Sequence, residues 1–290
     1  MEEDSSPVKK FIKDIAANKG AMIGFIFVAL FFILAIFAPF FAPFDPTTLH
    51  TDALRLPPLW ALEGKSGHLL GTDDVGRDIF SRLIYGARVS LGVGLAVVSL
   101  SLTAGTLFGL LSGFYGGLVD KFIMRTMDIL MALPSILLSI VVVAILGPGL
   151  NNAVIAVAIV AIPGLTRVVR ASVMNEKHKQ YVMAAKIFGR GDLGIMFKEI
   201  LPNCAAPLIV QGTLGFSEGI LNAAALGFLG LGAQPPTPEW GTMLSDSRSF
   251  IESSPWMVTL PGLCILIVVL GFNLFGDGLR DTLDPRLKKI

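Results

Sequence analysis

Long apolar stretches separated by short polar segments run through nearly the whole of this chain of 290 residues. An apolar run of about 18 residues or more is long enough to cross a bilayer as a helix. The runs of this kind that carry at most one charge are residues 20–41, 89–119, 129–166, 200–238 and 256–276. The pattern therefore predicts a protein that is embedded in a membrane.

The run at residues 129–166 is long enough for two helices. Gly147, Pro148 and Gly149 interrupt it near its middle, and glycine and proline stop a helix. We expect the asparagines that follow, Asn151 and Asn152, to cap the next helix. The sequence thus predicts an all-α membrane protein with about six transmembrane helices.

Basic residues divide the predicted loops into two classes. If the N-terminus is cytoplasmic, the cytoplasmic segments hold 17 of the 23 Lys and Arg residues, and an excess of this kind marks the cytoplasmic side. We therefore expect a multi-pass protein of the inner (cytoplasmic) membrane with both termini in the cytoplasm. The expected division is a cytoplasmic N-terminal segment at residues 1–19, a first transmembrane helix at 20–43, an outside loop at 44–88, a five-helix core at 89–276 that includes a cytoplasmic loop at 170–203 and an outside loop at 233–255, and a cytoplasmic tail at 277–290.

Composition supports the membrane assignment and excludes several kinds of site. Hydrophobic residues make up 53% of the chain and charged residues 16%, whereas soluble domains average about 25% charged residues. The net charge of +1 gives no reason to expect a nucleic-acid partner. The two cysteines and three histidines lack the spacing of a disulfide framework or a metal site, so we expect this chain to bind no metal and no cofactor.

Two short motifs resemble catalytic signatures but lack the structural context that those signatures need. Residues 64–66 (Gly-Lys-Ser) match the end of a phosphate-binding loop without its first glycine or a preceding strand. Residues 215–219 (Gly-Phe-Ser-Glu-Gly) match a nucleophile elbow, which requires a strand-to-helix turn. No histidine lies in a predicted span to act as a general base. We therefore expect no catalytic residue in this chain.

Small residues recur at intervals of four in two of the predicted spans. This spacing places them on one helix face, where they allow the backbones of two membrane helices to approach closely. We expect each set to form a helix–helix seam, against the alternative that glycine is simply common in membrane helices. The sets are Gly105, Gly109, Gly113 and Gly117 in the earlier span and Gly215, Gly219, Ala223 and Gly227 in the later one.

Glu218 is the one charged residue in the run at 200–238, and Asn222 lies one turn away on the same helix face. A charge near the bilayer centre costs about 2.5–3.5 kcal/mol on insertion scales, so it usually faces a cavity or a partner. Two interpretations stay open. Either Glu218 and Asn222 face a pore or a subunit interface, or Glu218 is a protonated, hydrogen-bonded structural residue.

The polar and basic segment at residues 170–203 contains a predicted short helix between Tyr181 and Gly189. Its alanines favour a helix, and Gly189 suits the position after the last helical turn. A short cytoplasmic helix between two membrane helices can transmit force from a soluble partner, or it can rest on lipid headgroups. The residues alone leave both possibilities open.

This segment resembles the EAA loop of ABC-importer permeases. The resemblance rests on Ala184 and Ala185, then Gly189, and then Leu201-Pro202 at the expected distance, while Met183 replaces the usual glutamate and Glu199 the usual isoleucine. It implies a coupling helix that docks into a groove of a separate ATPase subunit. The residues implicated are Tyr181, Met183, Ala184, Ala185, Phe188, Gly189, Leu201 and Pro202.

Further motifs extend the resemblance over nearly the whole chain. Residues 71–88, 225–232, 234–241 and 276–285 are similar to segments of peptide/nickel permeases, and most of all to the C-type permeases of dipeptide importers. The resemblance implies a type I ABC-importer permease-like fold and a translocation path for peptides, with oligopeptides, nickel chelates or sugars as the alternatives to dipeptides. It also implies a B-type permease as heterodimer partner, two ABC ATPase subunits that bind ATP and magnesium, and an extracytoplasmic peptide-binding protein.

The outside loop is expected to meet one of these partners. Asp78 is predicted to cap a short amphipathic helix at residues 79–85, with its apolar side toward the membrane and Arg82 in water. We expect Arg77, Asp78 and Arg82 to contact the binding protein or the B-type permease. The alternative is a structural plug over the first two helices.

Two other classes of protein fit the sequence less well. Stand-alone secondary transporters often carry paired intramembrane charges or internal repeats, whereas this chain has one mid-membrane acid and no clear repeat. An intramembrane enzyme lacks its histidine and metal ligands here. The sequence favours a non-enzymatic permease subunit whose energy comes from ATP hydrolysis in partner subunits.

Overall fold

The computed structural model describes residues 14–61 and 67–283, so residues 64–66, the basic residues before Asp14 and the end of the C-terminal tail lie outside it. The described part is helical and contains no strand, which confirms the predicted all-α fold. The elements are α2 (Lys19–Ile36), α3 (Ala38–Phe41), α4 (Ile79–Tyr115), α5 (Gly117–Met131), α6 (Ser135–Leu146), α7 (Leu150–Glu176), α8 (Gln180–Ile187), α9 (Asp192–Gly194), the π-helix η1 (Ile195–Ile200), α10 (Leu201–Asn203), α11 (Ala205–Phe228), α12 (Trp240–Ser247), the 3-10 turn η2 (Arg248–Phe250) and α13 (Trp256–Leu283).

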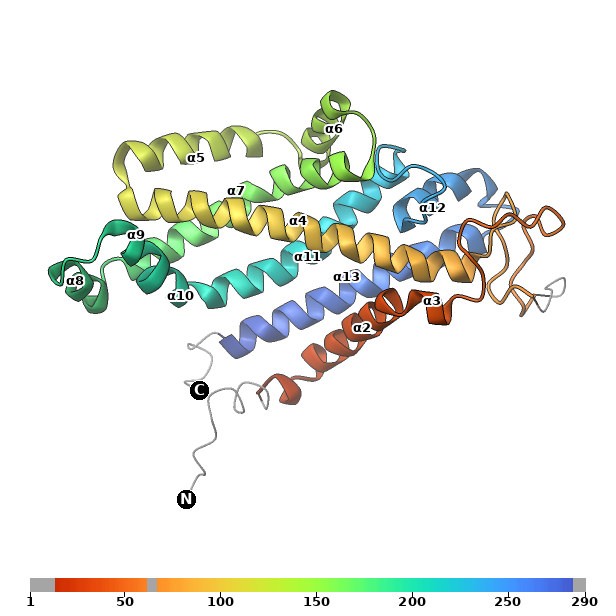
Figure 1. Ribbon diagram of the computed structural model, residues 1–290, viewed down its shortest axis with the longest axis horizontal. Helices are drawn as coiled ribbons and strands as arrows, with labels where there is room; N and C mark the ends of the chain where they lie inside the picture. Colours follow the sequence, from red (N-terminus) through yellow and green to blue (C-terminus); the bar gives the residue numbers. More distant parts are fainter. Residues whose placement is uncertain (1–13, 62–66, 284–290) are drawn as a thin grey trace, which may run out of the picture.

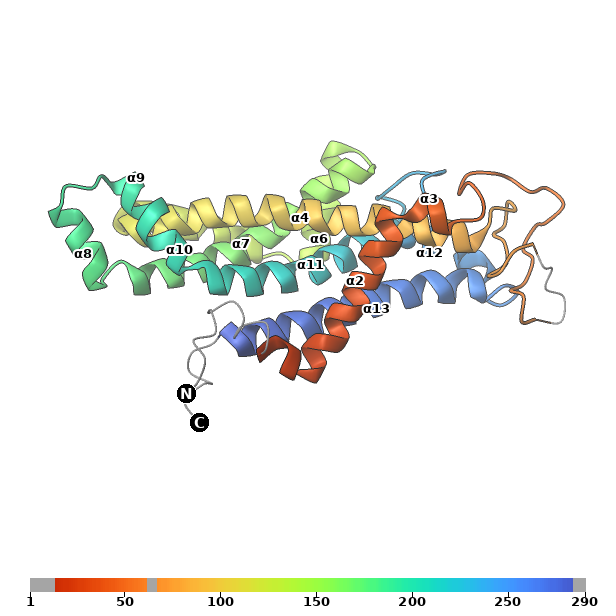
Figure 2. The same cartoon turned by 60° about the horizontal axis from the view of Figure 1, so that its bottom comes forward.

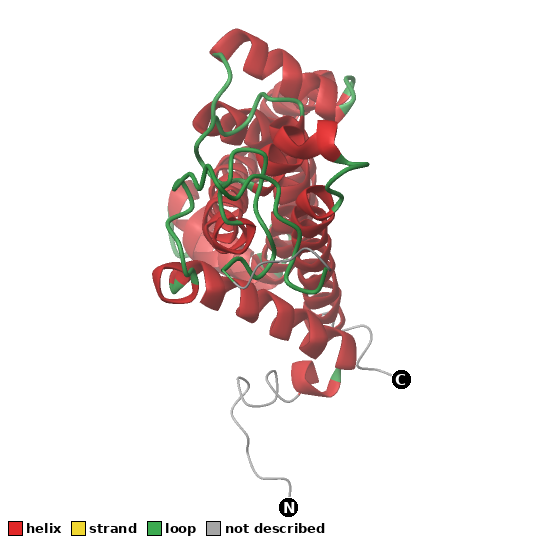
Figure 3. Cartoon of the chain, turned by 90° about the vertical axis from the view of Figure 1, so that its right-hand side faces the viewer, coloured by secondary structure: helices red, strands yellow, loops and turns green. Residues whose placement is uncertain are grey.

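The helices form an elongated bundle with two distinct ends. Helices α4, α7, α11 and α13 run along its long axis, and α2 crosses α13 (Figures 1 and 2). The segment from α8 to α10 lies at one end, toward which the start of α2 and the end of α13 also point (Figure 1). The loops around α12 and the segment before α4 lie at the other end (Figure 1), and Figure 3 looks onto this end, where the loops gather. The bundle therefore separates the 170–203 loop from the 44–88 loop, as the predicted topology requires.

The lengths of the helices agree with a membrane protein. Four of them, α2, α4, α7 and α13, are each long and apolar enough to cross a bilayer. Two further pairs pass the same test together, α5 with α6 across a bend of 94° and residues 192–203 with α11 across a bend of 68°. The described residues thus hold four helices that could span a membrane, or up to six candidate spans if each bent pair crosses the membrane once.

Residues 79–115 depart from the predicted pattern, because one continuous helix replaces the short helix and the membrane span that were expected there. Helix α4 runs without a break from Ile79 to Tyr115, so the expected short helix at 79–85 is its first part. Gly86 lies within this helix and leaves room for the Trp240 ring, whose Cδ1 atom is 2.8 Å from the position that a Cβ atom would take. The chain leaves α4 only at Gly116 and Gly117, whose φ angles of 69° and 54° few other residues adopt.

The run at 129–166 is divided differently from the prediction. The hairpin at residues 147–149 is confirmed, since α6 ends before it and α7 begins after it. The predicted cap is wrong, because Nδ2 of Asn152 donates to the carbonyls of Leu146 and Gly147 at 2.9 and 3.0 Å and so caps the end of α6. Helix α5 was not predicted, and α7 and α13 each continue beyond the expected span, to Glu176 and Leu283.

The first glycine stripe forms a close seam between α4 and α7. A Cβ atom on Gly109 would lie 2.5 Å from Cβ of Val169, and one on Gly113 would lie 2.8 Å from Cβ of Val173. Gly105 meets Leu165 in the same way at 2.7 Å. The predicted seam is therefore present at three glycines. Gly117 is the exception, because it lies after the helix end with open space around it.

The second stripe is shared between two neighbours of α11. Gly219 approaches Val97 of α4, with 3.1 Å from the Cβ position to Cγ1, and Gly215 lies near Val98 of the same helix. Gly227 instead faces Glu239, whose Oε2 atom is 2.5 Å from the position of a Cβ atom. The stripe thus packs against α4 in its first half and against the start of α12 in its second.

Candidate functional site

Helix α8 is held rigidly against the end of the bundle. Val182 is fully buried in an apolar cluster with Val173 of α7 and Ile195 of η1. The hydroxyl of Tyr181 donates to Oε2 of Glu176 at 2.6 Å. Burial and then this hydrogen bond raise the pKa of Tyr181 above its usual value, so the donor keeps its proton. One face of α8 is therefore fixed to the membrane helices.

The opposite side of α8 presents apolar side chains outside the bundle. Phe188 is 89% exposed, Ile187 is 84% exposed and Met183 is 50% exposed. Gly189 follows with a φ of 77° and lets the chain turn back, as predicted for the end of this helix. Exposed apolar residues in such a group mark a contact surface. We call Met183, Ile187 and Phe188 the α8 tip.

The other predicted coupling residues support this helix rather than form its tip. Ala184 is exposed beside the tip, and Ala185 is half-buried against the cluster around Val182. Leu201 packs on the same cluster from α10, where it is followed by Pro202. The structure therefore brings the predicted set together at one end of the bundle.

Glu218 and Asn222 lie on a face of α11 that the described residues leave uncovered. Glu218 is exposed and Asn222 is half-buried. Neither side chain makes a hydrogen bond or ion pair with residues 14–61 or 67–283. The structural interpretation of Glu218, which needs a hydrogen-bond partner, thus finds none within the described part of this chain.

The charged residues of the outside loop form a buried network. Asp73 accepts from Nε of Arg77 at 2.6 Å and lies 3.5 Å from Nε of Arg82. Arg82 is 2% exposed and Asp78 is 1% exposed. Asp78 caps α4 by accepting from the Ser81 amide at 2.8 Å, as predicted.

Two expectations for this region are corrected by that burial. Arg82 does not face water, because Asp73 and the carbonyls of Pro46 and Pro236 surround its guanidinium. Arg77 is 7% exposed and pairs with Asp73, so the side chains of Arg77, Asp78 and Arg82 face inward rather than toward a partner. The network fixes the loop to the start of α4 as a plug at this end of the bundle.

Replacing Asp73 by Asn is expected to loosen this plug. The substitution keeps the shape but leaves the buried Arg77 and Arg82 without their shared carboxylate, which lowers the free energy of unfolding by about 2 kcal/mol. Limited proteolysis of the loop and thermal unfolding in detergent measure the effect. Asp52→Asn, at an exposed position of the same loop, is the matched control. Equal unfolding of the two variants would contradict the assigned role of Asp73.

Glu239 and Trp240 form a second buried connection at the same end, which was not predicted from the sequence. Glu239 caps α12 by accepting from the amides of Gly241 and Thr242, both at 2.9 Å, and accepts from Oγ of Ser90 at 3.1 Å. Nε1 of the fully buried Trp240 donates to the Leu83 carbonyl at 3.1 Å. The loop after α11 is thereby tied to α4.

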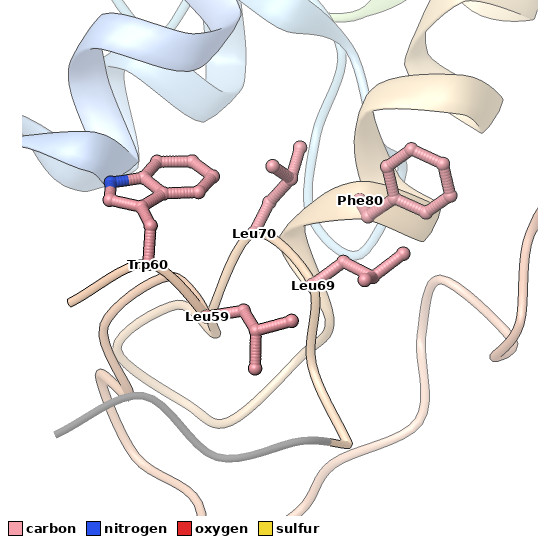
Figure 4. Close-up of a pocket in the computed structure, with 5 residues that line it drawn as sticks. All are labelled: Leu59, Trp60, Leu69, Leu70 and Phe80. Atoms are coloured by element: carbon pink, nitrogen blue, oxygen red, sulfur yellow. The ribbon is translucent and has the colours of Figure 1, made fainter. Parts of the chain in front are cut away.

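An apolar hollow lies at the end of the bundle where α4 begins (Figure 4). Its lining comes from the loop before α4 and from the first turn of α4 itself. Trp60 is 70% exposed at its edge. The side chains that line it are Leu59, Trp60, Leu69, Leu70 and Phe80. The hollow was not predicted, because its residues come together only through the folding of the loop.

Comparison with protein families identifies relatives of both parts of the chain. Residues 105–289 match the family described as "Binding-protein-dependent transport system inner membrane component". Residues 6–58 match the family described as "N-terminal TM domain of oligopeptide transport permease C". The first match covers more than half of the chain, and it includes α8 and α11.

Individual proteins are similar over almost the full length. The dipeptide transport system permease protein DppC of Haemophilus influenzae is 54% identical, over 98% of this chain and 96% of the relative. The di/tripeptide transport system permease protein DppC of Pseudomonas aeruginosa is 56% identical, over 98% and 93%. An inward-facing structure of the MetNI methionine ABC transporter shares the fold, with a TM-score of 0.54 and 17% identity over 70% of this chain and 96% of that one.

Proposed function

This chain belongs to the family of binding-protein-dependent transport system inner membrane components, and we propose that it is the C-type permease subunit of an ATP-driven importer of dipeptides. The observation that carries the proposal is α8, a helix anchored through Val182 and Tyr181 whose apolar tip projects from the bundle. A transporter that works without partner subunits has no need of such a surface. The names of the relatives support dipeptides as the substrate class.

In this proposal the chain forms one half of the translocation path. A B-type permease forms the other half, two ATPase subunits bind ATP and magnesium beneath them, and an extracytoplasmic binding protein delivers the peptide. The α8 end and both termini face the cytoplasm, in keeping with the distribution of Lys and Arg. The chain itself binds no nucleotide and catalyses no reaction.

The contacts of α8 indicate how a movement of the ATPase subunits would be transmitted to the translocation path. Val182 packs on Val173 of α7 and on Ile195 of η1, which continues through α10 into α11. Since Gly109 and Val169 interlock α4 with α7, a displacement of α8 moves these helices together. ATP binding then favours one of two arrangements of the permeases and hydrolysis restores the other, which is alternating access.

Reconstitution tests the proposed function directly. We expect proteoliposomes that contain this chain, its B-type partner and both ATPases to take up labelled dialanine only with ATP and the binding protein. A complex with hydrolysis-deficient ATPase subunits is the matched control and should show no net uptake. Uptake that persists without ATP would identify a secondary transporter instead, and ATP-driven uptake of another substrate class would change the assigned cargo.

A further inference from the structure

A polar stripe runs along the uncovered face of α11. Gln211, Glu218 and Asn222 follow one another at spacings of seven and four residues, which places them on one side of the helix. Glu218 is exposed and the other two are half-buried. None of the three forms a hydrogen bond or ion pair with the described residues. The stripe is thus a row of polar groups with no partner in the described part of the chain.

The buried side of the same helix is different. Oγ of Ser217 lies 2.6 Å from Oδ1 of Asn273 on α13 and 2.8 Å from the Leu214 carbonyl. Polar groups that face lipid find no partner there, and this is costly. An unpaired carboxylate near the middle of a membrane helix is stable only beside water or a group of complementary charge. The stripe therefore faces an aqueous path or a partner, and not the lipid.

Charge complementarity indicates which group binds beside Glu218. Glu218 is the only charged residue of α11, and the two arginines of the neighbouring α7, Arg167 and Arg170, already pair with Asp128 and Asp120 of α5. A peptide in transit carries a cation of its own, the α-ammonium group. A carboxylate in a medium of low dielectric constant attracts such a group strongly, and the charge-assisted hydrogen bond is among the stronger ones.

The spacing within the stripe matches the length of a dipeptide. Glu218 and Asn222 are separated by about 6 Å along the helix axis. The two ends of an extended dipeptide are about 7 Å apart. Gln211 is about 10 Å from Glu218 in the other direction, which is too far for the same dipeptide. The pair Glu218 and Asn222 therefore fits the two charged ends of one substrate.

We infer that Glu218 receives the α-ammonium group of a dipeptide during translocation, while the Asn222 amide donates to the carboxylate of the same dipeptide. This inference rests on the proposed function and adds a specificity-determining pair to it. Both partners must be unpaired in the resting chain to do this, and the described residues leave them so. The pair selects for a free amino terminus after the binding protein has released its cargo.

Charge substitution in the reconstituted transporter tests the role of Glu218. We expect Glu218→Gln to lower ATP-driven dialanine uptake about tenfold, with assembly and ATP hydrolysis retained. Glu218→Asp keeps the charge and should recover much of the rate, and Asn222→Ala should cause a smaller loss. Glu252→Gln removes the same charge from an exposed outer turn and is the matched control. Wild-type uptake by Glu218→Gln would overturn the inference.

Thiol labelling separates a substrate contact from a contact between subunits. The native Cys204 and Cys264 are first replaced by Ser, and Leu221→Cys is introduced at an exposed position three residues from the intact Glu218. In the assembled transporter we expect a water-soluble maleimide to label this position, and dialanine with the binding protein and ATP to slow the labelling. Labelling of the isolated chain but not of the assembled transporter would place Glu218 in the permease interface and overturn the inference.

The two proposals fail in different ways. If the wild-type complex does not import dialanine, the proposed function is wrong whatever Glu218 does. If the wild-type complex imports dialanine and Glu218→Gln imports it equally well, the proposed function stands and only the inference about Glu218 is lost.

Discussion

A leucine in place of Gly109 is expected to prevent this chain from folding stably. Gly109 lies at the centre of the α4–α7 seam, where a Cβ atom would be 2.5 Å from Cβ of Val169 and 2.9 Å from the Thr166 carbonyl. Neither atom can move aside without a shift of the α7 backbone. Overpacking of this kind costs about 3 kcal/mol or more when the backbone must move. Thermal unfolding in detergent and the amount of folded chain in membranes measure the loss.

Gly92 offers a matched control on the same helix. It lies within α4, as Gly109 does, but nothing is within 4 Å of the position of its Cβ atom. Gly92→Leu should be neutral or slightly stabilising, because leucine has the higher helix propensity by about 1 kcal/mol. If both leucine variants unfold at the same temperature, the α4–α7 seam does not carry the stability assigned to it here.

The close approach at this seam was predictable from the sequence, because the glycines that allow it all lie on one helix. Glycines spaced four apart mark a face that allows close approach, whatever helix lies opposite. The helix that fills this face was not predictable, since Leu165, Val169 and Val173 do not differ in type from residues that face lipid. Gly117 was assigned to the seam because the pattern continues through it, although α4 has ended by then.

Arg82 shows why the outer network could not be foreseen. Within residues 79–85 the periodicity predicts an amphipathic helix, and an arginine on its polar side is expected in water. In the structure that side is covered by Asp73 and by the carbonyl of Pro236, which is 154 residues away in the chain. Partners so remote in sequence leave no local signal. The apolar hollow near Trp60 was missed for the same reason.

The helical elements themselves differ in how well the sequence predicts them. Helix α8 was expected between Tyr181 and Gly189 and is found at Gln180–Ile187, because alanines and a terminal glycine define it locally. Helix α5 was missed because it carries charged residues and is too short to cross a bilayer by itself. Its acids are paired with α7, Asp120 with Arg170 and Asp128 with Arg167, each at 2.6 Å. A charged helix of this kind can be recognised only when the helix that supplies the opposite charges is known.

An aspartate at Phe188 is expected to release the ATPase subunits from the proposed transporter. Phe188 is 89% exposed at the α8 tip, so the substitution removes no contact within the chain and should leave thermal unfolding unchanged. In an apolar docking groove the new carboxylate would be desolvated without a partner, and the aromatic anchor would be lost. The loss of one such anchor weakens binding about 30-fold. Co-purification of the ATPases and dialanine uptake measure the effect.

Two companion variants separate docking from folding. Phe188→Leu keeps the position apolar and should retain most of the co-purified ATPase. Val182→Asp places a charge in the fully buried anchor of the same helix and should lower the unfolding temperature as well as ATPase binding. If the α8 tip instead rested on lipid headgroups, Phe188→Asp would leave ATPase binding at the wild-type level. The combination of normal stability with lost ATPase binding is therefore the result that identifies α8 as the docking element.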